Sequence, residues 1–106
     1  MTLSTLEALE LAATKGPWAN GEEHEFTAHL TCGGTVLAKF ERAMFSGHPH
    51  TINRRLTVAL RNSAPDLLAL ARAFQEWDRA AKDGDAGGVV TAVGKMREAI
   101  GRLEAS

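Results

Sequence analysis

The chain contains very little cysteine and no long apolar run, and both absences exclude whole classes of protein. Its single cysteine, Cys32, rules out an internal disulfide and any zinc site built from four cysteines, and it suits a reducing compartment. The N-terminal segment carries Glu7 and Glu10 within its apolar stretch and has no basic lead, unlike a signal peptide or a membrane span. We therefore expect a cytoplasmic protein without membrane contact.

An excess of charge of one sign is also lacking. The formal net charge of -1 gives no general attraction to nucleic acid or membrane, so any charge effect must be local. The 106 residues are 44% hydrophobic and 24% charged, which is ordinary for a soluble globular protein. We predict one small domain, residues 1 to 106, with one core.

A catalytic or metal-binding constellation is missing as well. His48, His50, His29 and Cys32 offer zinc-ligand chemistry, but no spacing places two of these ligands together on one helix or strand. Paired acids at residues 22 to 25 are typical of a solvated face, and the glycines near Asp85 lack the lysine of a phosphate-binding loop. We predict a protein that is not an enzyme and that holds no metal and no cofactor.

The longest periodic stretch runs from Thr51 to Lys82. Apolar residues recur there at spacings of three and four, which predicts one apolar helical stripe with the arginines mostly off it. The rest of the chain is expected to cover this stripe, which includes Ile52, Leu56, Leu60, Ala64, Leu67, Leu68, Ala71, Phe74 and Ala81. Pro65 predicts two helices or one kinked helix, about 51 to 62 and 64 to 82.

The first half of the chain predicts a short helix and a hairpin. Ser4 and Glu7 fit a capping box for a helix over about 5 to 14, and residues 18 to 23 are expected to form a loop. Alternating apolar residues then flank Cys32-Gly33-Gly34. A two-residue turn would put the two apolar sets on opposite faces, so we predict a three-residue loop. The expected pairs are Leu30 with Val36, Ala28 with Ala38 and Phe26 with Phe40.

The C-terminal segment predicts a last helix capped by Asp85. A seam of apolar residues at spacings of four and three should pack against the 64 to 82 helix as an antiparallel pair; it comprises Val89, Val93, Met96, Ile100 and Leu103. Gly87, Gly94 and Gly101 share another face, which indicates either close approach of a second backbone or simply a weak helix. The expected fold is α+β: an N-terminal helix, a two-stranded antiparallel hairpin, a kinked or broken long helix and this C-terminal helix. We expect a monomer or a weak dimer through the C-terminal helix.

Two segments carry a resemblance to a known family. Residues 13 to 18 read ATKGPW, and residues 53 to 68 read NRRLTVALRNSAPDLL, with the predicted hairpin between them. This arrangement resembles the Ead-like family of small phage and prophage accessory proteins over about residues 6 to 73, with Lys15 in place of the usual proline. The resemblance implies a phage or prophage origin and action inside a bacterial host cell. It implies no catalytic residue.

Local charge is the feature that points to a binding surface. Five acids against one lysine occupy residues 1 to 25, whereas residues 39 to 61 hold five bases against Glu41. We predict that a partner is bound through the basic face made of Lys39, Arg42, Arg54, Arg55 and Arg61. Substitution of Arg54, Arg55 and Arg61 by glutamate is expected to abolish partner binding and to leave the fold intact.

Two functions fit such a face. The first is inhibition of a host defence component, most concretely by an anti-CRISPR protein that acts on a nucleoprotein surveillance complex. The alternative is a regulatory protein that binds DNA or RNA directly, with a steep dependence on salt. The partner is thus a bacterial host protein or nucleoprotein complex, or nucleic acid itself.

Overall fold

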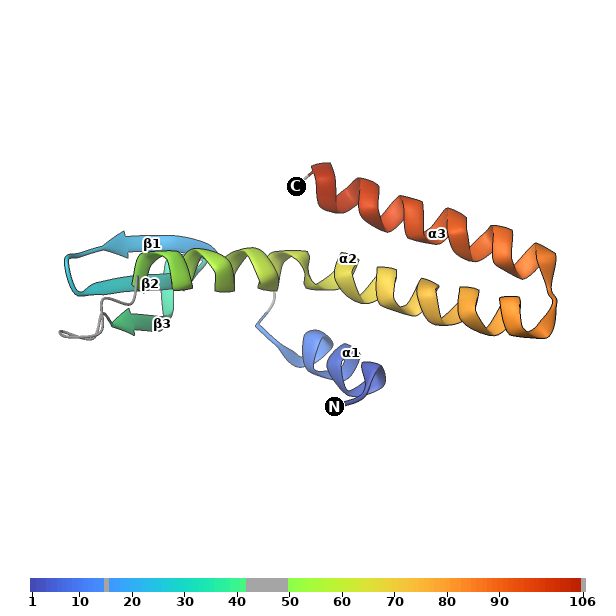
Figure 1. Cartoon of the computed structure of the whole chain (residues 1–106). Coiled ribbons are helices and arrows are strands. Elements are labelled where there is room, and N and C mark those ends of the chain that lie inside the picture. The colour runs from blue at the N-terminus through green and yellow to red at the C-terminus, as the bar shows by residue number, and fades with distance from the viewer. Residues whose placement is uncertain (15, 42–49, 106) are drawn as a thin grey trace. The chain divides into compact units, whose positions relative to one another are not determined.

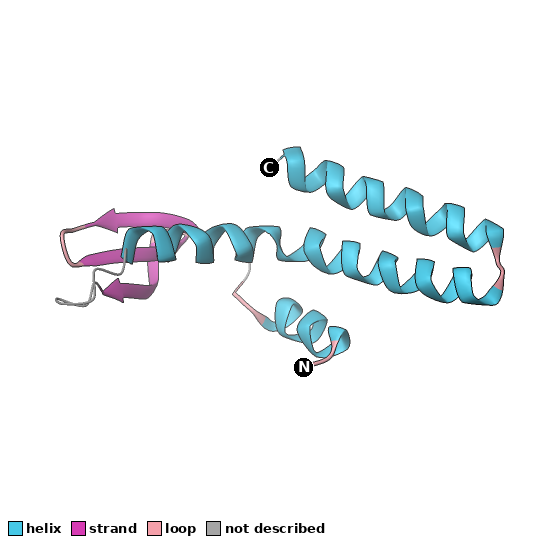
Figure 2. Ribbon diagram, in the orientation of Figure 1, coloured by secondary structure: helices cyan, strands magenta, loops and turns pink. Residues whose placement is uncertain are grey.

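The computed structural model describes residues 1 to 14, 16 to 41 and 50 to 105, and it is α+β as expected (Figures 1 and 2). The elements in chain order are α1 (Leu3–Ala12), β1 (Ala19–Glu23), β2 (Thr27–Cys32), β3 (Thr35–Glu41), α2 (His50–Asp83) and α3 (Ala86–Ala105). The predicted two-stranded hairpin is therefore wrong in number, because a third strand is present. In the part of the chain that the structure describes, no helix has the length and apolar character needed to span a membrane.

Contacts divide the chain into two compact units, and α2 contributes residues to both. We call residues 14 to 62 the sheet unit, and residues 1 to 13 with 63 to 106 the helical unit. The sheet unit contains the three strands and the start of α2, and the helical unit contains α1, the rest of α2 and α3. The expectation of a single domain stays a prediction.

The first helix begins earlier than the sequence predicted. Thr2 has an extended backbone, and its side-chain oxygen accepts a hydrogen bond from the Thr5 amide at 3.1 Å, so Thr2 is the N-cap. The predicted cap at Ser4 is wrong, since Ser4 lies inside the helix. Glu7 forms an ion pair with Arg72 instead of closing a capping box.

The third strand, β1, comes from the segment that was expected to be a loop. It pairs antiparallel with β2, with Ala19 opposite Thr31 and Asn20 opposite Leu30. Its sequence, ANGEE, has neither β-branched residues nor apolar alternation, so no strand pattern was there to find. Gly21 is required by close approach, because a β-carbon there would lie 2.6 Å from the Cγ2 atom of Thr31.

The pairing of β2 with β3 differs from the predicted register. The turn has two residues, Gly33 and Gly34, both with positive φ, and it sets Cys32 opposite Thr35. A bulge then shifts the pairing, so that Leu30 lies opposite Ala38. Because of the bulge, Ala28 lies opposite Phe40 and Leu30 lies opposite Ala38, so these four apolar residues share one face of the sheet. The predicted three-residue loop would also have placed the apolar residues on one face, with different pairs. Phe26 precedes the strand and remains exposed, as does Val36, which pairs with Thr31.

The core of the sheet unit uses the face of α2 that the sequence assigned to solvent. His50, Arg54 and Val58 recur every four residues on α2, and all three are buried. Ala28 and Leu30 are the buried residues of the sheet. The predicted core stripe is wrong in this part of the chain, because Ile52, Leu56 and Leu60 are all exposed.

In the helical unit, α3 packs antiparallel against the second part of α2, as predicted (Figure 1). Arg102 pairs with Asp66 and Lys95 pairs with Glu76, so rising numbers on one helix meet falling numbers on the other. Asp85 caps α3 as expected, since its Oδ1 accepts from the Gly88 amide at 3.0 Å. Pro65 lies within α2, which is a single helix from His50 to Asp83.

Small residues form the contact between these two helices. The buried positions are Ala73 and Ala80 on α2 and Ala92 and Ala99 on α3. The predicted seam was displaced by part of a turn, because Ile100 is exposed and its neighbour Ala99 is fully buried. The glycine stripe does not face another backbone here, because a β-carbon at Gly94 or Gly101 would meet no atom within 4 Å.

Candidate functional site

The structure does not gather the predicted basic face into one exposed cluster. Arg42 lies outside the described residues. Arg55 is exposed, Arg54 is buried and Arg61 is half-buried on α2, whereas Lys39 lies on β3. The environments of the four described side chains differ, and they decide which of these side chains is accessible to a binding partner.

Arg54 is part of the core and not of a surface. Its side chain is only 1% exposed. Its Nη1 atom donates to the carbonyl oxygens of Gly21 (3.3 Å), Glu22 (3.4 Å) and His29 (3.2 Å), and its Nη2 donates to the Glu23 carboxylate. The guanidinium is planar and carries several N–H donors, so one side chain can bond α2 to both β1 and β2. The premise that Arg54 is a surface residue is therefore wrong, and we now expect charge reversal there to destabilise the fold.

Glu23 is shared between two arginines. Its Oε1 atom accepts from Arg54 and also from Arg55, the latter at 3.0 Å. Partial desolvation raises the pKa of Glu23, but hydrogen bonds from Arg55 and Arg54 outweigh it, so its pKa lies below the usual 4.5. One acid of the acidic segment thus pairs with two arginines of the basic segment. One positive charge remains in excess over this shared carboxylate.

Arg61 belongs to a second structural cluster, around Trp18. The Asn62 side chain accepts from the Trp18 amide (2.9 Å) and donates to the Trp18 carbonyl (2.8 Å). Arg61 donates to the Thr14 carbonyl at 3.3 Å, and its guanidinium carbon lies 5.4 Å from the centre of the Trp18 ring. These contacts join the two segments that carry the family resemblance, and they anchor the tryptophan.

Lys39 is exposed and lies on β3, on the face of the sheet that does not carry the buried residues. It lies opposite His29, and both residues alternate with the buried positions Ala28 and Leu30. Side chains at successive strand positions point to opposite faces. Lys39 therefore projects from the sheet face opposite to the buried one.

The largest unexpected feature of the sheet unit is an exposed apolar row on α2. Ile52, Leu56 and Leu60 are 58%, 57% and 52% exposed. We call these three residues the apolar α2 face. It lies roughly opposite Arg54, because two residues along a helix correspond to a turn of about 200°. Sequence periodicity found this row but assigned it to the core.

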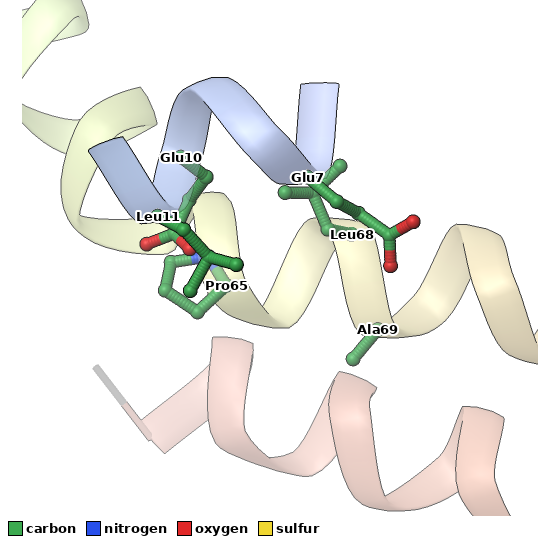
Figure 3. Close-up of a pocket in the computed structure, with 6 residues that line it drawn as sticks. All are labelled: Glu7, Glu10, Leu11, Pro65, Leu68 and Ala69. Carbon is green, nitrogen blue, oxygen red and sulfur yellow. The ribbon is translucent and has the colours of Figure 1, made fainter. Parts of the chain in front are cut away.

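Several hollows open to solvent lie on the described residues of the helical unit, among them a small pocket and a wider groove. A pocket of about 270 Å³ has Glu7, Glu10 and Leu11 of α1 on one side and Pro65, Leu68 and Ala69 of α2 on the other (Figure 3). Glu7 is engaged by Arg72, so this carboxylate is not an isolated acid or base. A wider apolar groove of about 690 Å³ is lined by Leu3, Leu67, Leu70, Ala71, Phe74, Gln75 and Met96.

Among the described residues, His24, His29, His50 and Cys32 do not assemble into a metal centre. His50 is buried, and its Nε2 donates to the His24 carbonyl oxygen at 2.9 Å. The rings of His29 and His24 form an edge-to-face contact, with their centres 5.8 Å apart. Across the described ranges, no group of three or more His, Cys, Asp or Glu side chains is placed to hold a metal ion. His48 lies outside these ranges, so the metal-free state stays a prediction.

Comparison with known proteins leaves the family open. No family model, no curated protein and no solved structure matches this chain. The resemblance to the Ead-like family therefore stays a prediction.

Proposed function

We propose that this protein is a non-enzymatic, phage-encoded accessory protein that binds and inhibits a bacterial host defence component. In its most concrete form it is an anti-CRISPR protein that acts on a nucleoprotein surveillance complex in the host cytoplasm. The observation that carries the binding role is the apolar α2 face, three large aliphatic side chains in one row that are each more than half exposed. Exposed apolar patches of this kind mark interaction sites.

The charges around this face favour a protein partner over free nucleic acid. Arg54 is withdrawn into the core, and Glu23 is bound by both Arg54 and Arg55. Fewer cations are therefore available for phosphates than the sequence suggested, and an apolar row gives nothing for phosphates to bind. The binding residues in this proposal are the apolar α2 face with Arg55 at its edge. Lys39 projects from the other face of the sheet and Arg61 contacts Thr14 and Trp18, so neither belongs to this surface. Arg42 lies outside the described residues.

The test is a phage plating assay in a bacterium with active CRISPR immunity. The protein should raise the plating efficiency of a targeted phage, and Leu56→Glu should abolish this effect because it places a charge in the apolar row. Leu56 is exposed, so the variant should keep the unfolding midpoint of the parent protein. An isogenic strain without the CRISPR genes should show no effect of either protein.

Two results would count against the proposal. The anti-CRISPR function would be refuted if the protein left the plating efficiency of the targeted phage unchanged in every immune strain tested. Direct binding of purified protein to free DNA or RNA, with a steep loss of affinity between low and high salt, would support the nucleic-acid alternative instead.

A further inference from the structure

We propose that the apolar α2 face docks an acidic amphipathic helix of the target protein. This inference rests on the proposed function, which supplies a protein partner, and it adds the chemistry of the partner's docking element. That element carries apolar residues at spacings of three and four and carboxylates along the edge that meets Arg55.

The shape of the face fits a helix. Ile52 and Leu60, with Leu56 between them, are eight residue steps apart, or about 12 Å along the helix axis. They form a ridge of residues four apart, and exposed Ala59 leaves a shallow strip beside it. Ridges of this kind pack into the grooves of a second helix. A flat or extended partner would leave one side of the ridge uncovered.

The charges beside the face select an acidic partner. The part of α2 from His50 to Ala64 contains three arginines and neither aspartate nor glutamate. Arg55 precedes Leu56 and Ala59 by one and four residues, which places it on the edge of the apolar row, and its side chain is 59% exposed. Among the described residues, the carboxylate that Arg55 contacts is that of Glu23, which also accepts from Arg54. A carboxylate from outside would therefore complete the pairing of Arg55.

The same charges disfavour a second copy of this chain as the occupant. In an antiparallel pair centred on Leu56, equal edges of the two helices lie together, so the two Arg55 side chains would approach each other. In a parallel pair, the Arg55 edge would meet the edge that carries Asn53 and Thr57, which offers no charge. Neither arrangement provides the carboxylate that an acidic partner brings.

Two designed peptides provide the test, each a helix of about 20 residues with the same leucine seam. One carries glutamates along the edge of the seam and the other carries lysines at the same positions. Titration into the intact, isotope-labelled protein should show the acidic peptide binding at least about tenfold more tightly, equivalent to 1.4 kcal/mol. Amide shifts should centre on residues 52 to 60.

Three variants sharpen the result. Leu56→Glu should abolish binding of the acidic peptide, and Arg55→Glu should reverse the preference between the peptides. Leu67→Glu is the matched control, because it changes an exposed leucine of α2 that belongs to the helical unit, and it should bind like the parent.

The inference is overturned if both peptides bind equally, if Leu56→Glu binds normally, or if the shifts map to other residues. It is also overturned if sedimentation shows a dimer that Leu56→Glu dissociates, since a second copy then covers the face. Loss of phage protection in Leu56→Glu without selective peptide binding would refute only the acidic-helix inference. Selective peptide binding without phage protection would refute only the anti-CRISPR proposal.

Discussion

The sheet unit and the helical unit bury opposite kinds of side chain from the same helix. In the sheet unit, α2 contributes His50, Arg54 and Val58 to the interior and leaves its aliphatic row exposed. In the helical unit, it contributes Ala73 and Ala80 and meets alanines of α3. Amphipathicity thus describes which residues share a face, whereas the neighbouring element decides which face is covered.

The difference follows from what each neighbour needs. The backbone carbonyls of Gly21, Glu22 and His29 accept hydrogen bonds from Arg54, so the arginine satisfies acceptors that an aliphatic side chain would leave unpaired. A second helix such as α3 has its own backbone bonds satisfied, so it can pack closely against small apolar residues. The predictions below test this contrast, from the largest expected effect to the smallest.

Removal of the buried arginine should have the largest effect. Arg54→Met keeps most of the side-chain volume but leaves three carbonyl groups without the Arg54 donor and Glu23 with Arg55 alone. We expect a loss of about 3 kcal/mol or more in the free energy of unfolding, because each of the three carbonyl acceptors left unsatisfied costs about 1 to 3 kcal/mol. Residue-resolved hydrogen exchange should show lost protection in β1 and β2, with α3 still protected.

The control is Arg55→Met, because Arg55 contacts the same carboxylate from an exposed position. It should change the free energy of unfolding by no more than about 1 kcal/mol. Equal effects of the two substitutions would show that burial of Arg54 is not what holds the sheet unit together.

Overfilling the alanine contact should have the next largest effect. Ala99 is fully buried, and Ala99→Leu should lower the free energy of unfolding by about 1 to 3 kcal/mol because the helices must move apart. Hydrogen exchange should place this loss in α3 and not in β2. Ala81→Leu is the control, since Ala81 adjoins buried Ala80 but is exposed and has room for a larger side chain. A neutral Ala99→Leu would show that α2 and α3 do not pack through their alanines.

The glycines of α3 should respond in opposite directions. Gly94→Ala and Gly101→Ala meet open space, so each should raise the free energy of unfolding by about 0.8 to 1 kcal/mol through helix propensity. Gly88→Ala should destabilise, because its β-carbon would lie 3.0 Å from the Ala80 β-carbon and 2.5 Å from Asp85 Oδ2. Thermal unfolding of the three variants measures both effects. Destabilisation by Gly94→Ala would instead support a close contact at the glycine stripe, as in a dimer through α3.

Acid should weaken each unit through a different carboxylate, with the smallest effects. The pKa of Glu23 lies below 4.5 through Arg55 and Arg54, and that of Glu76 lies below 4.5 chiefly through its hydrogen bond from Lys95. A lowered pKa gives stability that is present above pH 4.5 and is lost as pH falls through the folded value.

Carboxyl NMR titration should find both pKa values below 4.5. Glu23→Gln should reduce the acid sensitivity of the sheet unit only, and Glu76→Gln that of the helical unit only. A Glu23 pKa at or above 4.5 would mean that its two arginine contacts do not persist in solution.

Part of the candidate site could be read from the sequence. The periodicity of residues 51 to 82 correctly grouped Ile52, Leu56 and Leu60 on one face, and the charge pattern singled out Arg54 and Arg55. Their burial is the reverse of the prediction, since the apolar row is exposed and Arg54 is buried. Nothing in a single sequence reveals that a guanidinium will meet three carbonyl oxygens, because those acceptors come from residues 25 to 33 positions earlier.

The sequence by itself determined the local features of the chain. Asp85 caps α3 and the long apolar period gives α2, because each depends on residues close in sequence. The glycines located the turn between β2 and β3, but the turn has two residues and not the predicted three. The tertiary structure alone decided that ANGEE becomes a strand, that a bulge follows the turn, and which face of α2 is buried. These outcomes depend on pairing and burial between distant segments, where satisfying backbone groups outweighs the preference of any one segment.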